Sequence, residues 1–290
     1  MSDVEEKLMK ILVIQENGRH DKNRHLRECF SLQRSFEKLG HECHVWGLGH
    51  EWFMEHPVWD SYDLILNIEN YDETGWVPNL KDVKTTKFLW SIDAHCGMEQ
   101  VFNKTFVEGK YDKLLHSTKD FVKEDNHVWF PNAYDNNFIF PMNIQKENTF
   151  GFCGNFGNRK ELILKLNRDF GMKLDIFVLG DDMVRAINSY RCHFNKNIAN
   201  DINYRSFETI GCGTLLLTNY NPQYDELGFI HGENCFMYKN EDHLYEIMRE
   251  LSEWNEDHNK IASEGFKLAK KHTYDERVKN LLEIKNHLEK

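Results

Sequence analysis

The sequence predicts an α/β protein made of two Rossmann-like halves, and three observations support this prediction. Short apolar segments alternate with longer segments whose apolar residues recur at helical spacing, which is typical of a mostly parallel sheet. The alternation lapses over the polar stretch 131–148 and then starts again. The length of 290 residues accommodates two domains of roughly 140 residues each, within the usual size range of domains.

The first half begins with the apolar segment 10–15, which is typical of a buried strand. A polar loop, 16–23, leads into a helix whose apolar residues recur every three to four positions up to Leu39. Gly40 is expected to end that helix. Further strands are expected at 44–46, 64–68, 87–93, 114–117 and 128–130. We therefore expect a first domain over residues 1–140.

The second half repeats the pattern with a strand at 149–153, a turn at 154–158 and a helix at 159–170. Later elements are expected as strands at 174–179 and 214–218 and as helices at about 204–210, 241–254, 259–271 and 274–289. We therefore expect a second domain over residues 149–273.

Net charge argues against a large nonspecific nucleic-acid interface. The chain has 36 Lys and Arg residues against 47 Asp and Glu residues, which gives a formal charge of −11 and a surface that repels polyanions. Residues 19–38 are a local exception, with six Lys or Arg residues against three acids. A solvated helix face is the simpler interpretation of this stretch.

The cysteines and the hydropathy pattern indicate where in the cell the protein is located. The seven cysteines are widely spaced and form no Cys-x-x-Cys pair, which argues against a disulfide framework or a cysteine zinc site. The apolar runs are only a few residues long, far below the ~20 residues that a membrane-spanning helix needs. The first residues do not resemble a signal peptide. We expect a cytoplasmic protein without integral membrane association.

The most informative motif places a carboxylate inside a helix, a glycine turn behind it and an apolar strand beyond. Its sequence is Phe207-Glu208-Thr209-Ile210-Gly211-Cys212-Gly213. This motif resembles the C-terminal half of GT-B glycosyltransferases, especially the group-one enzymes and the spore-maturation-protein-like branch, in which Phe-Glu-x-x-x-Cys-Gly precedes a buried strand. The resemblance extends from about Phe150 to Leu282, and the residues before Phe150 show a weaker resemblance.

The resemblance implies a GT-B fold, with two Rossmann-like domains facing across a cleft. It also implies that a final helix, 274–290, crosses back to the first domain. The implied activity is transfer of a sugar from a nucleoside diphosphate sugar, with a UDP-sugar as the expected co-substrate and no other cofactor. The expected acceptor is a hydroxyl of a glycan, a small molecule or modified DNA.

Two alternatives remain open at this stage. The short chain also resembles glycosyltransferases encoded by tailed bacterial viruses, so a bacteriophage-encoded member acting on hydroxymethylated bases in DNA is one alternative. The other is a protein of a different class, which holds a nucleotide or sugar without catalysing a reaction.

Four donor contacts are expected at the turn that opens the second half. Gly154 and Asn155 lie where free backbone N–H groups and a helix dipole favour a diphosphate, and Arg159 and Lys160 supply countercharge. The resembling family has an arginine for the donor phosphates at this place, which implies that role for Arg159.

Three further donor contacts follow from the motif and the loop after it. Glu208 corresponds to the glutamate that binds the donor ribose hydroxyls in group-one enzymes, and a carboxylate can accept from both hydroxyls. Arg205, one turn earlier, could reach a phosphate or pair with Glu208. Glu226 corresponds to an acid that contacts the sugar. The family's first glutamate is replaced by Asn200, so the sequence does not predict stereochemistry.

The expected catalytic residues are Asp93 and His95, which follow an apolar strand of the first half. Ligands bind at the carboxyl ends of parallel strands, so either side chain could accept the acceptor's proton. The Asp-x-His string also resembles the metal-binding motif of GT-A glycosyltransferases. Because the chain has two Rossmann-like halves and its donor motif lies in the second, we expect no metal. The alternative to a catalytic role is that Asp93 caps the next helix.

The loop after the first strand contributes four more candidates. In GT-B enzymes this loop lies over the cleft and helps to bind the acceptor or a donor phosphate. Gly18 permits close approach of the backbone, Arg19 adds a positive charge, and His20 and Asp21 are alternative bases. The alternative is that these four residues form an ordinary polar loop that faces solvent and binds no substrate.

Overall fold

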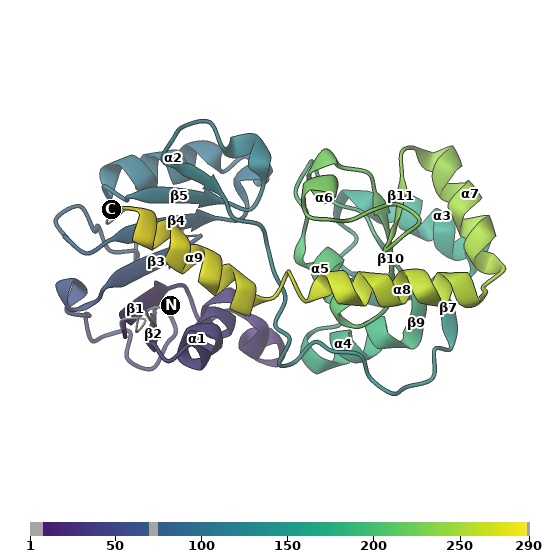
Figure 1. The fold of residues 1–290 in the computed structure, drawn as a ribbon, viewed down its shortest axis with the longest axis horizontal. Coiled ribbons are helices and arrows are strands. Elements are labelled where there is room, and N and C mark those ends of the chain that lie inside the picture. Colours follow the sequence, from purple (N-terminus) through teal and green to yellow (C-terminus); the bar gives the residue numbers. More distant parts are fainter. Residues whose placement is uncertain (1–7, 70–74, 289–290) are drawn as a thin grey trace, which may run out of the picture. The chain divides into compact units, whose positions relative to one another are not determined.

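A computed structural model describes residues 8–69 and 75–288, and these residues divide into two compact units. The first unit comprises the described residues of Met1–Pro131 and Tyr274–Lys290, and the second comprises Asn132–Thr273. Each unit consists of a parallel sheet with helices packed on it (Figure 1).

The first unit contains a six-stranded parallel sheet in the order β2-β1-β3-β4-β5-β6. Its strands are β1 (Lys10–Ile14), β2 (Glu42–Trp46), β3 (Leu64–Ile68), β4 (Lys87–Ser91), β5 (Lys113–His116) and β6 (His127–Trp129). Its α-helices are α1 (Glu28–Lys38), α2 (Glu99–Glu108) and α9 (Tyr274–Leu288). The described residues of this unit also form the 3-10 helices η1 (Asp21–Leu26), η2 (Trp59–Ser61), η3 (Ala94–Cys96) and η4 (Lys119–Phe121).

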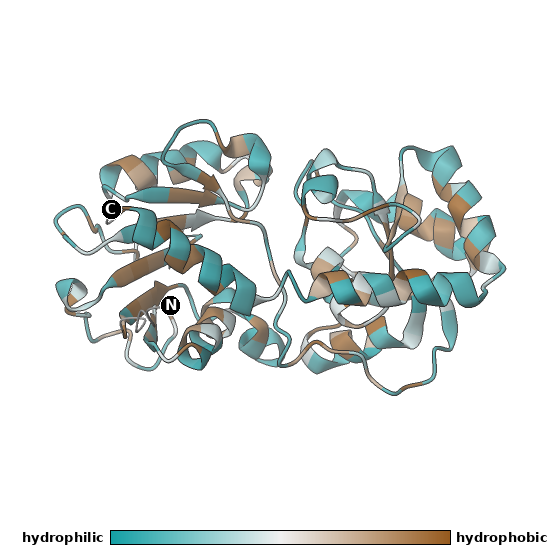
Figure 2. Ribbon diagram, in the orientation of Figure 1, coloured by the Kyte–Doolittle hydropathy of each residue, from teal (hydrophilic) through white to brown (hydrophobic). Residues whose placement is uncertain are grey.

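Burial on both faces of this sheet explains the sequences of its strands. Every residue of β3 and β4 is buried, and these strands read Leu-Ile-Leu-Asn-Ile and Lys-Phe-Leu-Trp-Ser. Near-continuous apolar runs are typical of parallel strands that have helices on both sides. Helix α1 covers the sheet with Cys29, Leu32 and Phe36, which share one face at helical spacing. Figure 2 shows the apolar strands against largely polar helices.

Helix α9 belongs to the first unit although the whole second unit precedes it in the sequence. The carboxylate of Asp275 accepts a hydrogen bond from the Ser35 hydroxyl (2.9 Å) and pairs with Lys38 Nζ at 2.5 Å. The buried Arg277 donates from Nε to the carbonyl oxygen of Pro131 (2.8 Å). The start of α9 is therefore fixed to α1 and to Pro131, which follows the last strand of the first sheet.

The second unit contains a five-stranded parallel sheet in the order β11-β10-β9-β7-β8. Its strands are β7 (Asn148–Gly154), β8 (Lys173–Ile176), β9 (Tyr190–Asn195), β10 (Leu215–Asn219) and β11 (Phe236–Tyr238). Its helices are η5 (Gly157–Arg159), α3 (Lys160–Phe170), α4 (Gly180–Ser189), α5 (Tyr204–Gly211), α6 (Pro222–Glu226), α7 (Glu241–Ser252) and α8 (Glu256–Ala269).

Strand β9 was not expected from the sequence, although it lies in the middle of the second sheet. Its sequence includes Arg191, His193 and Asn195, which interrupt the apolar pattern. His193 and Asn195 are nevertheless buried, because hydrogen bonds described below satisfy their polar atoms. The apolar residues Tyr190, Cys192 and Phe194 alternate with these polar residues, and this period-two alternation is the strand signal that sequence reasoning missed.

The second unit begins earlier than the sequence suggests. The expected first domain ends at residue 140, whereas contacts assign Asn132 onwards to the second unit. Asn132 Nδ2 donates to the carbonyl oxygen of Ile202 (3.0 Å), and the Tyr134 N–H donates to the carbonyl oxygen of His272 (3.2 Å). Apolar periodicity is weak here because the segment is held by hydrogen bonds rather than by a regular element.

No helix in the described part of the chain is long and apolar enough to cross a membrane.

A glycine of the Phe-Glu-x-x-x-Cys-Gly motif has a packing role. Gly211 ends α5 against the buried ring of Tyr134, and a Cβ atom added at Gly211 would lie 2.6 Å from that ring. Gly213, two residues later, has φ +65°, which favours glycine at the turn before β10. The motif's glycines therefore allow α5 to pack closely and the chain to turn back into the sheet.

Gly211→Ala should lower the free energy of unfolding by about 1–3 kcal/mol, because the added methyl group overpacks a closed site. Urea denaturation measures this cost. In a Tyr134→Ala background, where the ring is absent, the same substitution should cost much less. Equal costs in the two backgrounds would show that the Tyr134 contact does not constrain Gly211.

Candidate active site

The predicted donor residues of the second unit gather at the carboxyl ends of its strands. Gly154 is the last residue of β7, and Asn155 follows it on the surface. Arg159 ends η5, and the exposed Lys160 begins α3. Because β7 and β9 are parallel neighbours, residues that follow the two strands meet at one edge of the sheet.

Arg159 connects the loops that follow β7 and β9. Its Nη1 atom donates to the carbonyl oxygen of Lys196 (2.7 Å), and its Nη2 atom donates to that of Asn155 (2.6 Å). Burial, together with the neighbouring positive charge of Arg205, lowers the pKa of Arg159. Two guanidinium groups are thus held near one another at this edge, which favours binding of an anion.

Arg205 and Glu208 form an ion pair within α5. Arg205 Nη1 bonds to Glu208 Oε2, and Arg205 Nε donates to the carbonyl oxygen of Cys153 (3.1 Å). Glu208 is only 8% exposed. Burial alone would lower the pKa of Arg205, but the Glu208 carboxylate raises it above its usual value. The sequence left two roles open for Arg205, a phosphate contact and an ion pair with Glu208. In the structure Arg205 forms the ion pair.

The fully buried His193 joins β9 to β7 and to α5. Its Nε2 atom accepts a hydrogen bond from the Cys153 N–H (3.1 Å), so the neutral ring carries its proton on Nδ1. Nδ1 donates to the Thr209 hydroxyl (2.5 Å), which in turn donates to the carbonyl oxygen of Arg205. Burial lowers the pKa of His193 to about 3, so the ring stays neutral at physiological pH.

A buried polar network fixes the start of α5 and of α6. The hydroxyl of the fully buried Tyr224 accepts from Asn197 Nδ2 (2.7 Å) and lies 2.7 Å from Ser206 Oγ. Asn195 Nδ2 also donates to Ser206 Oγ (3.0 Å). Sequence reasoning missed this network. Its signal is the cluster of asparagines that begins at the last residue of β9 and continues after it: Asn195, Asn197, Asn200 and Asn203.

Glu226 lies at the exposed end of the short helix α6. The helix begins with Asn221, whose side chain accepts from the Gln223 N–H (2.9 Å), and has Pro222 at its first position. Tyr224 anchors α6 through the polar network. The helix that carries Glu226 is therefore well positioned, while the Glu226 side chain faces solvent.

In the first unit, Asp93 and His95 follow β4 and are half-buried. Asp93 precedes η3, but its side chain makes no capping hydrogen bond to this helix. The next helix, α2, begins after Met98. Capping of a following helix therefore does not explain Asp93. Ligand atoms of Asp93, His95 and Cys96 lie within 4.8 Å of one another, which makes this set a possible metal site.

Glu69, which sequence reasoning missed, lies near Asp93. It follows β3 with φ +48°, and its N–H donates to the carbonyl oxygen of Trp90 (2.9 Å). Its Oε1 atom is buried and receives no hydrogen bond from the described residues. Burial, and then repulsion by Asp93 and Glu28, raise the pKa of Glu69 well above its usual range. The strand-end argument that selected Asp93 could also have selected Glu69, since both follow strands of one parallel sheet.

The loop after β1 is constrained at Gly18 and exposed beyond it. Gly18 has φ +78°, and a Cβ atom there would lie 2.5 Å from Cδ of Arg27. Arg19, His20 and Asp21 are exposed, and Asp21 pairs with Arg24. Gly18 thus permits close packing on Arg27, while the other predicted loop residues are solvated.

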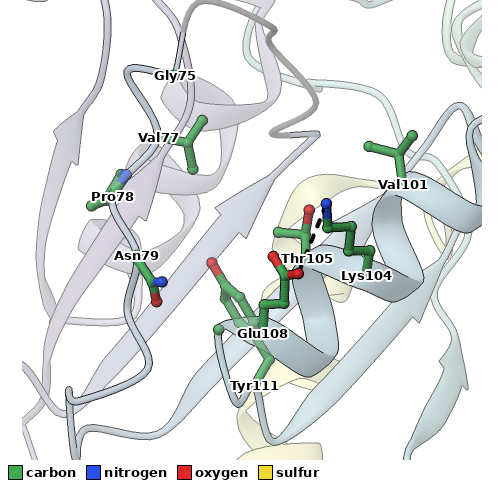
Figure 3. Close-up of a pocket in the computed structure, with 10 residues that line it drawn as sticks. Gly75, Val77, Pro78, Asn79, Val101, Lys104, Thr105, Glu108 and Tyr111 are labelled. Carbon is green, nitrogen blue, oxygen red and sulfur yellow. Dashed lines mark ion pairs between the residues drawn. The ribbon is translucent and has the colours of Figure 1, made fainter.

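A pocket of about 540 Å³ lies elsewhere in the first unit, between α2 and the segment 75–79 (Figure 3). Asn79 and Val77 line one side, and Lys104 and Glu108 line the other as an ion pair of 3.8 Å. None of the predicted site residues is among the described residues that line it. The pocket is lined by residues of α2 from Val101 onwards, whereas Asp93 and His95 precede that helix.

A family match covers most of the second unit and the first part of α9. Residues 144–283 match the family described as "Glycosyl transferase-like". A search of curated proteins found no match.

Solved structures resemble the chain over nearly its whole length. A glycosyltransferase from Rickettsia africae ESF-5 has 12% sequence identity and a TM-score of 0.66, with 98% of this chain and 100% of that chain covered. An α-glucosyltransferase, solved with UDP and a 13-mer DNA containing a central A:G mismatch, has 11% identity and a TM-score of 0.71, with 96% and 99% covered.

Anabaena HepE, solved with UDP-glucose, has 12% identity and a TM-score of 0.61, with 95% of this chain and 99% of that chain covered. The structural matches confirm the predicted GT-B fold, and the family match, taken with them, confirms the prediction of a glycosyltransferase.

His193 generates a prediction about stability. His193→Gln should reduce the free energy of unfolding near pH 7 by about 1–3 kcal/mol, because buried hydrogen-bonding groups lose their partner. The folded-state pKa of about 3 lies below the unfolded value of 6.5. The wild type therefore loses the contribution of His193 as pH falls below 6.5, whereas the variant has none to lose.

The stability difference between wild type and His193→Gln should accordingly shrink between pH 7 and pH 4, as measured by urea denaturation at each pH. His287→Gln, which alters an exposed histidine of α9, is the matched control and should show little difference at any pH. A difference for His193→Gln that stays constant with pH would contradict the neutral buried ring.

Proposed function

We propose that this chain, a glycosyltransferase with the GT-B fold, transfers a sugar from a UDP-sugar to a hydroxyl acceptor and needs no metal ion to do so. The observation that carries the proposal is the ion pair between the half-buried Arg205 and the buried Glu208, beside Arg159 at the carboxyl edge of the second sheet. This edge offers positive charge for a diphosphate and a carboxylate for ribose hydroxyls. The α-glucosyltransferase and HepE structures were solved with UDP and with UDP-glucose, respectively, which supports the choice of nucleotide.

Positive charge at this edge is proposed to take the place of a metal. A diphosphate leaving group gains negative charge as the bond to the sugar breaks, and fixed positive groups stabilise that charge. Arg159 and Lys160 lie at the beginning of α3, where the backbone N–H groups and the helix dipole add to their effect. Arg205 adds a third cation when the diphosphate draws its guanidinium away from Glu208.

Glu208 is proposed to exchange its partner when the nucleotide binds. In the structure its Oε2 atom accepts from Arg205. A bound ribose would supply two hydroxyl donors to the same carboxylate, which has lone pairs for several hydrogen bonds. Glu226, on the anchored helix α6, is proposed to contact the sugar hydroxyls.

On the acceptor side, Asp93 or His95 is proposed to take the proton of the attacking hydroxyl. In the transfer, the bond between the sugar's anomeric carbon and the diphosphate oxygen breaks, and a bond to the acceptor oxygen forms. Glu69 is a poor candidate for the base because its raised pKa favours the protonated acid. A protonated Glu69 can instead donate a hydrogen bond. The loop residues Gly18, Arg19, His20 and Asp21 are proposed to contact the acceptor.

A modified base in DNA is the second candidate acceptor. The α-glucosyltransferase with the similar fold was solved with DNA, and Arg19 and Lys22 are exposed positive residues of this chain. The net charge of −11 opposes binding to long DNA. Activity on hydroxymethylated DNA, compared with glycan and small-molecule acceptors, decides between these candidates.

We also propose a cytoplasmic location for the protein. All seven cysteines are free thiols, which is typical of proteins in a reducing compartment.

Glu208→Gln should weaken UDP binding by roughly tenfold or more, because a hydrogen bond to a charged group contributes about 1.5–3 kcal/mol. Arg159→Ala should have an effect of similar size through the phosphates. Isothermal titration calorimetry measures both, at a temperature at which circular dichroism shows each variant folded. Glu264→Gln is the matched control, since Glu264 forms an exposed i,i+3 pair with Lys267. If both site variants bind UDP with wild-type affinity, the carboxyl edge of the second sheet is not the donor site.

Transfer should continue at an undiminished rate in EDTA, because side chains and helix ends neutralise the diphosphate. The measurement is donor turnover before and after chelation, with manganese added back. Complete loss in EDTA that manganese restores would contradict the proposal and favour a catalytic metal at Asp93 and His95, as in GT-A enzymes.

Substituting both Asp93→Asn and His95→Ala should reduce transfer by roughly a hundredfold or more, since a positioned general base contributes about 10²–10⁴ in rate. UDP affinity should be nearly unchanged, because the donor residues lie in the other unit. Asp82→Asn, at an exposed acid of the same unit, is the matched control. Wild-type rates in the single and double variants would exclude both residues and direct attention to His20, Asp21 and Glu226.

A further inference from the structure

Three different metal-binding side chains meet directly after β4. The carboxylate of Asp93, the imidazole of His95 and the thiol of Cys96 have ligand atoms within 4.8 Å of one another. The 3-10 helix η3 brings these residues together, and the Cys96 N–H donates to the carbonyl oxygen of Asp93 (2.9 Å). Among the seven cysteines, all of which lie in described residues, Cys96 alone is exposed. A thiol that solvent reaches is thus placed beside a histidine and an acid.

The chemistry of this set selects one class of cation. Thiolate and imidazole are ligands that zinc prefers, whereas Mg²⁺ and Mn²⁺ prefer oxygen ligands. In a tetrahedral zinc site, ligand atoms lie roughly 3.5 Å apart, given metal–ligand distances of about 2.0–2.3 Å. A spacing within 4.8 Å can reach this geometry through side-chain rotation. Three protein ligands leave the fourth position for water.

The surrounding charge also favours a cation. Glu69 interacts electrostatically with both Asp93 and Glu28, so three carboxyl groups lie in one region of the first unit, with Arg27 as a neighbouring positive group. The repulsion that raises the pKa of Glu69 would be offset by a divalent ion beside Asp93, which would favour the ionised form of Glu69. The absence of a second nearby cysteine does not weigh against the site, since a mixed set of Asp, His and Cys needs only one.

We propose that Asp93, His95 and Cys96 bind a zinc ion, and that the bound ion inhibits sugar transfer. Binding releases the proton of the Cys96 thiol to solvent and involves no oxidation or reduction. The ion occupies the two side chains that are proposed to take the acceptor's proton. The inhibition therefore rests on the proposed function, whereas the binding itself does not.

Cobalt tests the site without an activity assay. Titration of the reduced, metal-free protein with Co²⁺ should produce a thiolate-to-cobalt charge-transfer absorption together with the visible bands of tetrahedral cobalt. Zinc added afterwards should abolish both signals. Cys96→Ser should eliminate the charge-transfer absorption and lower zinc affinity at least tenfold in competition with a chromophoric chelator. His95→Ala should lower the affinity similarly.

Two controls complete the experiment. His287→Ala, at an exposed histidine of α9, should bind zinc as the wild type does. Cys96→Ser should retain transfer activity in EDTA and should resist zinc concentrations that inhibit the wild type. A missing charge-transfer absorption, or equal zinc affinity in wild type and Cys96→Ser, overturns the metal site. Zinc binding at these residues without loss of transfer overturns the inhibition, and it also removes Asp93 and His95 from the proposed chemistry without affecting the donor site.

Discussion

The carboxyl edge of the second sheet is organised by one ion pair, in which Glu208 is buried and Arg205 is half-buried. A charge that is largely removed from water is unfavourable unless a partner and hydrogen bonds compensate it. Here the compensation comes from the pair itself and from the carbonyl oxygen of Cys153 at the end of β7. His193 holds the same strand end and the helix that carries the pair. The sheet edge is therefore arranged around a charged pair, which we propose is separated by the diphosphate of the nucleotide.

Much of the fold could be predicted because its strands are buried on both faces. Strands such as β3 and β4 are apolar throughout, and the motif around Glu208 indicated both the helix and the strand after it. β9 could not be recognised in the same way. Its polar residues His193 and Asn195 are buried only because partners from β7 and α5 satisfy them, and those partners are far away in the sequence.

In the candidate site, too, positions along the chain could be predicted from the sequence but long-range partners could not. The strand-end rule selected Asp93 and Arg159, which follow β4 and β7, because position after an apolar strand can be recognised in the local sequence. Their partners are a property of the fold. Sequence left the choice between phosphate and Glu208 open for Arg205, and the environment of Glu69 depends on residues from other strands and from α1. Burial and long-range pairing decide such features, and neither has a signature in a single sequence.

The most direct test of this account is a thermodynamic cycle between Glu208 and the ribose of the nucleotide. Isothermal titration calorimetry would compare UDP with 2′-deoxyuridine diphosphate on the wild type and on Glu208→Gln. Removing the 2′-hydroxyl should cost the wild type roughly tenfold in affinity and the variant much less, because the lost hydrogen bond to a charged acceptor contributes about 1.5–3 kcal/mol. Equal losses in both proteins would show that Glu208 does not bind the ribose and would contradict the account.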